Sequence, residues 1–192
     1  LGHSAGKNTK CLNTIIIGND AGNESKVSTD NYEGCILLGN ESGKKAQNLK
    51  GDVLIGHNTG VDIKGNMNTI IGFDSGQRFG SKNTVIGYKS ASLATGNNNT
   101  VIGHASGGNI SNGNVIIGDG ISIYDKDLTS NKLNECVIIG SQSSQKAKLG
   151  EGSVIIGYGT GQNKGNRNTL IGYKIQSVNN EVENNDNTII GW

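Results

Sequence analysis

The sequence predicts an all-β parallel β-solenoid that runs through the whole chain. Three observations predict it. A glycine preceded by two aliphatic residues recurs along the chain, most repeats are only 15 to 16 residues long, and each offers β-branched residues between Asn and Gly instead of helix formers. So short a unit cannot bury a hydrophobic face alone, so successive units must stack as coils of a solenoid.

The motif glycine defines the length of the array. It stands at Gly18, Gly39, Gly56, Gly72, Gly87, Gly103, Gly118, Gly140, Gly157, Gly172 and Gly191, with Gly2 after a truncated copy. Successive spacings are 16, 21, 17, 16, 15, 16, 15, 22, 17, 15 and 19 residues. They predict about 11–12 coils in one repeat array over residues 1–192. Both ends match only part of the motif, so we expect a fragment of a longer chain.

Three longer spacings predict loop insertions near residues 27–33, 121–134 and 178–186. Insertions in solenoids lie on the surface, where repeat proteins commonly place recognition. The middle insertion is the best candidate for a receptor contact, and the alternative is that it only decorates the shaft. Its candidate contact residues are Tyr124, Asp125, Lys126 and Asp127.

The aliphatic columns of the motif predict an interface. Successive side chains of a strand point to opposite faces, so we expect positions one and three before the glycine to fill the interior and position two to point outward. That outward column would form an apolar stripe about 50 Å long, which needs a cover. We therefore expect identical chains in parallel register to cover it. The alternative is that both columns lie in the core of one chain. The trimer-interface candidates are Ile16, Leu37, Leu54, Ile70, Val85, Val101, Ile116, Ile138, Ile155, Leu170 and Ile189.

Side chains with rings are concentrated at the position directly after the motif glycine. All three His and five of the eight aromatic residues of the chain occupy it. The functional interpretation is a corner ladder that contacts glycans or a protein receptor. The alternative is that the rings stack on one another and stabilise the corner. The receptor-contact candidates are His57, Phe73, Tyr88, His104, Tyr158 and Tyr173.

Composition excludes several other classes. The formal net charge is +1, so we expect no nucleic-acid partner, and no apolar run is long enough for membrane contact by this segment. The three cysteines form no CxxC pair, and no catalytic or metal-ligand spacing is present. We expect no enzyme, no cofactor and no metal.

The motif resembles the head repeats of YadA-like trimeric autotransporter adhesins. The runs that carry the resemblance are Asn13 to Gly18, Asn83 to Gly87 and Asn99 to Gly103. Similar runs, such as Ala94 to Gly103, occur in phage and virus tail-fibre proteins. The resemblance covers the whole chain and implies a left-handed β-roll, a homotrimer, a structural or adhesive role, and an extracellular place on a cell surface or in a virion or phage fibre. Most units here have one residue fewer before the glycine than the adhesin motif.

Two further classes share parts of the pattern. The sequence Ile-Gly-x-x-Ser resembles one rung of the hexapeptide acyltransferases, but no period of six is sustained. A Thr column, which includes Thr69, Thr84 and Thr100, is similar to that of ice-binding solenoids. It holds one Thr per coil, and we expect its face to be buried. The alternative functions are therefore a monomeric binding solenoid such as an ice-binding protein, and a hexapeptide-type acyltransferase.

Overall fold

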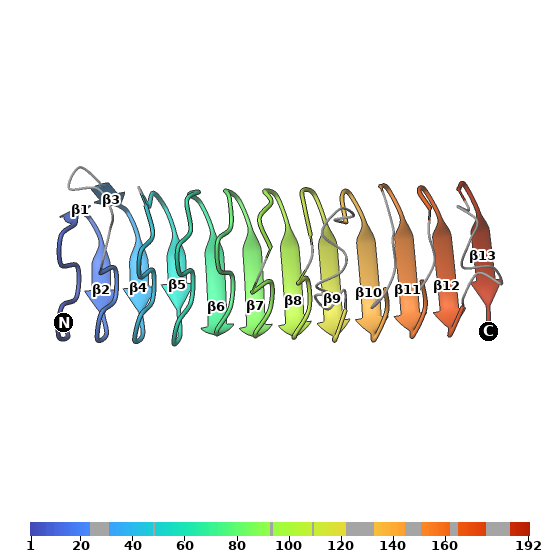
Figure 1. Ribbon diagram of the computed structural model, residues 1–192, viewed down its shortest axis with the longest axis horizontal. Coiled ribbons are helices and arrows are strands. Elements are labelled where there is room, and N and C mark those ends of the chain that lie inside the picture. Colours follow the sequence, from blue (N-terminus) through green and yellow to red (C-terminus); the bar gives the residue numbers. More distant parts are fainter. Residues whose placement is uncertain are drawn as a thin grey trace.

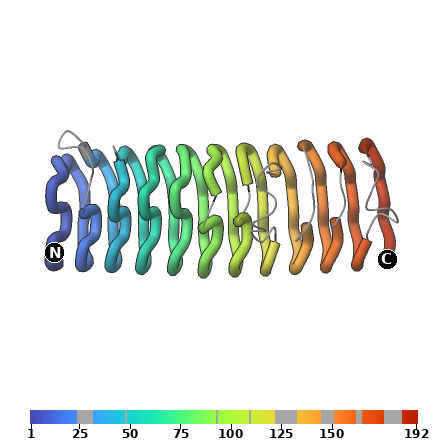
Figure 2. The backbone as a smooth tube through the Cα atoms, viewed as in Figure 1, coloured from blue at the N-terminus to red at the C-terminus, as the bar shows by residue number. Residues whose placement is uncertain are grey.

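The computed structural model confirms the all-β parallel solenoid. It describes residues 1–23, 31–47, 49–92, 94–108, 110–121, 133–144, 151–161, 165–175 and 185–192. No helix occurs among these residues, so none of them belongs to a helix able to cross a membrane. The coils follow one another along a single axis, with the N-terminus at one end of the rod and the C-terminus at the other (Figures 1 and 2).

One 11-stranded sheet runs along the rod. Its strands are β2 (Ile15–Ile17), β4 (Ile36–Leu38), β5 (Val53–Ile55), β6 (Thr69–Phe73), β7 (Thr84–Tyr88), β8 (Thr100–His104), β9 (Val115–Asp119), β10 (Val137–Ser141), β11 (Val154–Tyr158), β12 (Thr169–Tyr173) and β13 (Thr188–Gly191). Each strand pairs in parallel with the strand of the next coil, and the motif residues stay in register. A second sheet joins β1 (Lys10–Leu12) to β3 (Asn31–Glu33).

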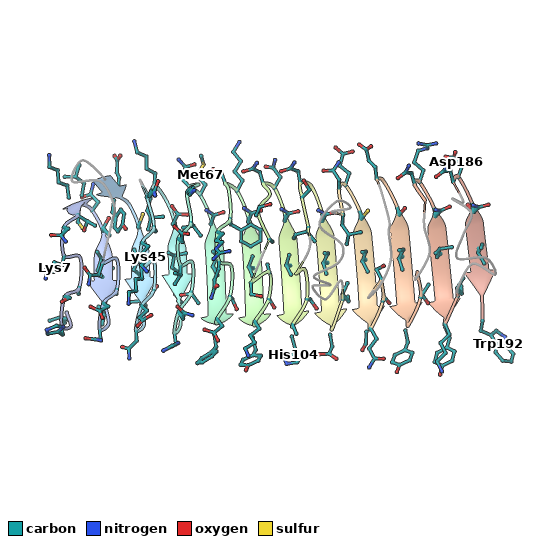
Figure 3. All side chains as sticks on the ribbon, in the orientation of Figure 1. Lys7, Lys45, Met67, His104, Asp186 and Trp192 are labelled. Carbon is teal, nitrogen blue, oxygen red and sulfur yellow. The ribbon has the colours of Figure 1, made fainter. Side chains whose placement is uncertain are left out.

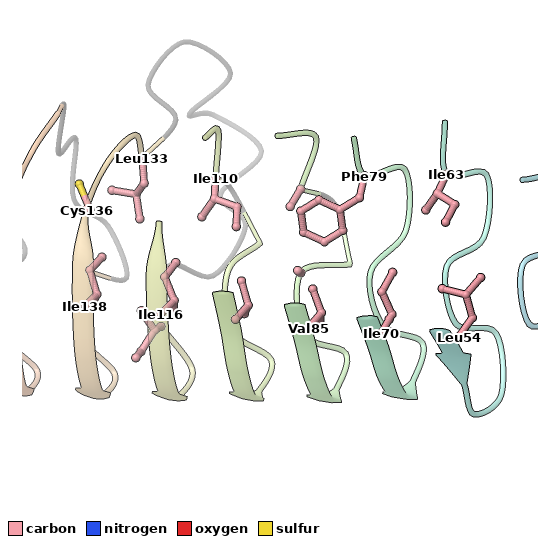
Figure 4. Close-up of a cluster of buried hydrophobic side chains, with 14 of the residues drawn as sticks. Leu54, Ile63, Ile70, Phe79, Val85, Ile110, Ile116, Leu133, Cys136 and Ile138 are labelled. Atoms are coloured by element: carbon pink, nitrogen blue, oxygen red, sulfur yellow. The ribbon is translucent and has the colours of Figure 1, made fainter. Parts of the chain in front are cut away.

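The core of the rod is narrow. From β4 to β12, the side chain two residues before the motif glycine is fully or almost fully buried. It packs against side chains from the opposite wall of the coil, such as Ile63, Phe79, Ile110 and Leu133 (Figure 4). Each coil therefore contributes a few large side chains, and stacking makes one continuous core.

The prediction that this column points outward is wrong. Leu37, Leu54 and Ile70 have no exposed surface. At the two ends of the sheet the column is more open, because Ile16 is half-buried and Ile189 is 40% exposed. The residues predicted as the trimer interface belong to the column that forms the core of one chain: Ile16, Leu37, Leu54, Ile70, Val85, Val101, Ile116, Ile138, Ile155, Leu170 and Ile189. The alternative that both aliphatic columns lie inside is also wrong, since the column one before the glycine lies on the outside.

A buried polar ladder explains the correction. The residue four before the glycine lies on the same face as the core column, and it is Asn in most coils. The amide side chains bond one another from coil to coil: Asn83 donates from N and Nδ2 to Oδ1 of Asn68 at 3.0 and 3.1 Å, and Asn99 bonds Asn83 in the same way. A column of polar side chains that hydrogen-bond one another can be buried. An Asn at this position therefore does not indicate the outer face of the strand.

The motif glycine is required by close stacking. Gly72 has a φ of +150°, and a Cβ on it would lie 1.9 Å from the carbonyl oxygen of Gly87 in the next coil. The same clash, with the next motif glycine, recurs along the rod. Any side chain at this position would push two coils apart.

Candidate interaction surfaces

The outer side of the long sheet forms one of two candidate surfaces, here named the flat face. It consists of the positions one and three before the glycine, and every one of these residues is half-buried or exposed. The first column is Ile17, Leu38, Ile55, Ile71, Ile86, Ile102, Ile117, Ile139, Ile156, Ile171 and Ile190. The second is Ile15, Ile36, Val53, Thr69, Thr84, Thr100, Val115, Val137, Val154, Thr169 and Thr188.

The flat face is apolar along its whole length. Ile17 is 43% exposed, Ile86 37% and Ile117 36%. Ten strand spacings of about 4.8 Å by three residues of about 3.3 Å give a plan area on the order of 500 Å². A contiguous apolar patch of this size is near the upper end of what a soluble monomer exposes, and such patches are often functional.

The Thr column lies on this face, so the prediction that its face is buried is wrong. Thr69, Thr84 and Thr100 are half-buried and stand in register on successive strands. The column changes to Val in β9, β10 and β11 and returns to Thr in β12 and β13.

The second surface, here named the aromatic ladder, lies where the strands of the sheet end. Ring centroids are 4.9 Å apart for His57 and Phe73, 5.5 Å for Phe73 and Tyr88, and 5.4 Å for Tyr88 and His104, with interplanar angles of 9° to 15°. A second stack joins Tyr158 to Tyr173 at 5.5 Å. Figure 3 shows His104 at the end of β8. The predicted column of rings is thus brought together in two stacks.

Stacking uses most of the ring faces. Inside each stack, the face of one ring contacts the next ring. A binding partner can therefore reach the ring edges and the hydroxyl groups, whereas ring faces stay open only at the ends of a stack. Lysines cover part of the rest, because the Nζ atoms of Lys89 and Lys174 lie 5.2 Å from the ring centroids of Tyr88 and Tyr173. The self-stacked alternative therefore describes the geometry, and a receptor contact stays a prediction.

The predicted insertions fall partly outside the described residues. Tyr124, Asp125, Lys126 and Asp127 all lie outside them. Of the first insertion, residues 31–33 form β3, whose Tyr32 is buried and donates from its hydroxyl to the carbonyl oxygen of Ala46 at 3.0 Å.

Two titratable groups of the aromatic ladder, His104 and Asp119, contact each other. His104 Nδ1 lies 2.7 Å from Asp119 Oδ1. Ser141 lies in the next coil, on the side of Asp119 away from His104, so the three side chains do not stand in the order Ser-His-Asp. Burial raises the pKa of the Cys35 and Cys136 thiols, which keeps them protonated at neutral pH. Within the described ranges no three His, Cys, Asp or Glu side chains are placed to hold a metal ion.

One buried acid is a feature that the sequence analysis missed. Asp52 takes the place of Asn at the start of the buried ladder and has no exposed surface. Its Oδ1 accepts from Asn68 N at 2.8 Å and from Asn68 Nδ2 at 3.0 Å, and its Oδ2 accepts from Lys50 N at 2.9 Å. Desolvation nevertheless raises the pKa of Asp52 to about 6. Its alignment with the motif asparagines was the signal available in the sequence.

The fold and the two surfaces define a β-solenoid repeat protein. Comparisons with protein-family models, with curated proteins and with solved structures give no significant match. Inferences about function therefore depend on the geometry of the flat face and of the aromatic ladder.

Proposed function

We propose that this chain is a segment of a homotrimeric fibre or adhesin head, in which three parallel rods join through their flat faces. The role is structural and adhesive: it gives rigid length and displays a surface for attachment to a receptor or host, outside the cell or as part of a virion or phage fibre. The single observation that carries the proposal is the exposed aliphatic column of the flat face, which extends from β2 to β13.

The energetics favour covering this face. A fully buried Ile or Leu gains about 1.5 to 3 kcal/mol, and the residues of the aliphatic column are already partly covered. At about 1 kcal/mol each, the 11 residues of this column contribute on the order of 10 kcal/mol per chain before the entropic costs of association. Apolar patches of this size on soluble proteins often serve as interaction sites.

Identical copies fit this surface best. The coils of parallel chains meet at equal heights, so each Ile layer faces an Ile layer and each Thr layer faces a Thr layer. Thr69, Thr84 and Thr100 form one polar block between Val53 and Val115. Thr hydroxyl groups at the same height can bond one another, whereas a slipped register would bury some of them against Val. The Thr blocks therefore favour an in-register assembly.

Rigid length follows from the continuous sheet. Each of its 11 strands is hydrogen-bonded to its neighbours, and the buried Asn ladder adds bonds between coils. A rod of this kind is suited to a shaft, with the aromatic ladder at its edge available to a partner.

The solution mass tests the proposal. Light scattering coupled to size exclusion is expected to give about 60 kDa, three times the 20.0 kDa chain. Ile86→Lys places a charge in the middle of the flat face and is expected to reduce the mass to that of a monomer. Met67→Lys is the matched control, because Met67 is 56% exposed and lies on a turn away from the face. A monomeric wild type, or a trimer that tolerates Ile86→Lys, contradicts the proposal.

A monomeric ice-binding solenoid is the second candidate, and one observation favours it. Thr and aliphatic side chains are presented outward in two straight columns on a flat sheet, two residues apart along each strand. A monomer that holds ice crystals below their melting point in a nanolitre osmometer would establish this function. A trimer would cover the same face and exclude it.

A further inference from the structure

The aromatic ladder is interrupted between its two stacks. In the position after the glycine, β9 carries Asp119 and β10 carries Ser141, in register with His104 on one side and Tyr158 on the other. The Asp119 carboxylate lies against His104, with 2.7 Å between Oδ1 and Nδ1. The Ser141 layer thus has only a small side chain between a carboxylate and a tyrosine ring. This gap is here named the Ser141 notch.

Among the described residues, no ring and no lysine is stacked on the face of Tyr158 that looks into the notch. Tyr173 stacks on its other face at 5.5 Å. Tyr88 and Tyr173 are each followed by a lysine whose ammonium lies over the ring, but Tyr158 is followed by Gly159.

Two glycines flank the rim of the notch, and the Gln142 side chain lies between their coils and reaches the Tyr158 hydroxyl. Asp119 is followed by Gly120, so neither the carboxylate nor the Tyr158 ring has a neighbouring side chain after it. These two are the only glycines two residues after a motif glycine in the part of the chain that the structure describes.

The notch has the thickness of one ring. Asp119 and Tyr158 lie two strand spacings apart, about 9.6 Å. A flat ring midway between them would be about 4.8 Å from each, close to the 4.9 to 5.5 Å between stacked rings of the ladder. One ring therefore fits above Ser141, and two do not.

The groups around the notch match a polyhydroxylated ring. The Asp119 carboxylate accepts hydrogen bonds, the Ser141 hydroxyl donates and accepts, and the Gln142 amide lies beside the ring, with its Oε1 accepting from the Tyr158 hydroxyl at 3.0 Å. The apolar C–H face of a sugar packs on an aromatic face. The one carboxylate is shared with His104, which makes the site a poor one for a free cation.

We propose that the Ser141 notch binds one neutral pyranose ring, stacked on Tyr158 with its hydroxyl groups on Asp119 and Gln142. This assigns a ligand class to the adhesive part of the proposed function and rests on that part, but it does not depend on trimer formation.

Saturation-transfer NMR on the whole chain tests the proposal, with methyl β-D-glucopyranoside and methyl β-D-galactopyranoside as probes and tetramethylammonium as the cationic comparison. A single stacked ring is expected to bind in the millimolar range. Ser141→Tyr fills the notch and is expected to lower the affinity at least tenfold. Tyr already occupies this position in β7, β11 and β12, so this variant completes the stack and keeps the fold, as its melting temperature will report.

Asn40→Tyr is the matched control. It adds a tyrosine to the same column next to His57, far from the notch, and is expected to leave sugar binding unchanged. The proposal is overturned if neither sugar binds, if Ser141→Tyr binds as the wild type does, or if only tetramethylammonium binds. The solution mass of the same samples separates the two proposals: a monomer that binds sugar contradicts only the trimer, and a trimer that binds none contradicts only the notch.

Discussion

Ser106 donates a hydrogen bond of 2.8 Å from its hydroxyl to the carbonyl oxygen of Gly118, the motif glycine of the next coil. The same contact recurs from Ser143 to Gly157 at 2.7 Å and from Thr160 to Gly172 at 2.9 Å. The motif glycine turns its carbonyl group toward the interior, and the small hydroxyl residue three positions after the glycine of the preceding coil satisfies it. The corner of each coil is thus bonded to the next.

Ser106→Ala is expected to destabilise the rod by about 1 kcal/mol, because the partly buried Gly118 carbonyl group loses its side-chain donor. Chemical denaturation followed by circular dichroism measures the change, at equal protein concentration for all variants. Ser106→Thr keeps the hydroxyl, as Thr160 does in the same column, and is the matched control. Equal losses in both variants would show that packing, and not this hydrogen bond, sets the cost.

The sequence was sufficient to predict the parallel solenoid and a strand before each motif glycine from Gly18 to Gly191, because that glycine repeats along the chain. It was not sufficient to orient the strand. Ile70 and Ile71 are equally apolar, yet Ile70 is fully buried and Ile71 faces outward. The deciding residue is Asn68, whose burial depends on bonds to Asp52 and Asn83 in other coils. A hydrogen bond between side chains of different coils cannot be recognised from a local hydrophobic pattern.

The aromatic ladder was predictable because its members share one position of the motif. The Ser141 notch was not predictable from the sequence, because it arises where the small side chain of Ser141 stands in register with the Tyr158 ring of the next coil. A gap becomes visible only when the register between strands is known.

Ala105 adopts a left-handed conformation, with a φ of +47°. The same position of other coils has positive φ throughout, and it is glycine at Gly120 and Gly159. The left-handed conformation costs a residue with a Cβ about 1 to 2 kcal/mol, partly offset by the greater freedom of glycine in the unfolded chain. Ala105→Gly is therefore expected to stabilise the protein by about 0.5 to 1 kcal/mol, measured as an increase in the denaturation midpoint.

Gly159→Ala is the reverse experiment. The added Cβ would meet only the Cγ of Lys174, at 3.4 Å, and that flexible side chain can move. A loss of about 1 kcal/mol would thus report the backbone conformation alone. If Ala105→Gly destabilises while Gly159→Ala does not, backbone strain at this corner is not the controlling term.

Asp52 makes the stability of the rod depend on pH. Burial raises the pKa of Asp52 to about 6 from an ordinary value of 3.8. Between these two values the folded chain holds a proton that the unfolded chain has released, so the contribution is fully present below pH 3.8 and is lost as the pH rises through about 6. The difference of about 2 pKa units corresponds to about 3 kcal/mol.

Asp52→Asn is expected to remove this dependence and to extend the Asn ladder by one coil. At pH 7 the variant avoids the cost of about 3 kcal/mol for the buried ionised acid. It also loses the hydrogen bond from Lys50 N to Asp52 Oδ2, which costs about 1 kcal/mol, so the net gain in stability should be about 1 to 2 kcal/mol. The free energy of unfolding of both proteins, measured from pH 4 to pH 7, checks the prediction. Arg167 lowers the pKa of the exposed Asp186, but both proteins keep that pair, so their difference isolates Asp52. Parallel curves for the two proteins would mean that the pKa of Asp52 is the same in the folded and the unfolded chain, and that its bonds to Asn68 and Lys50 offset its burial.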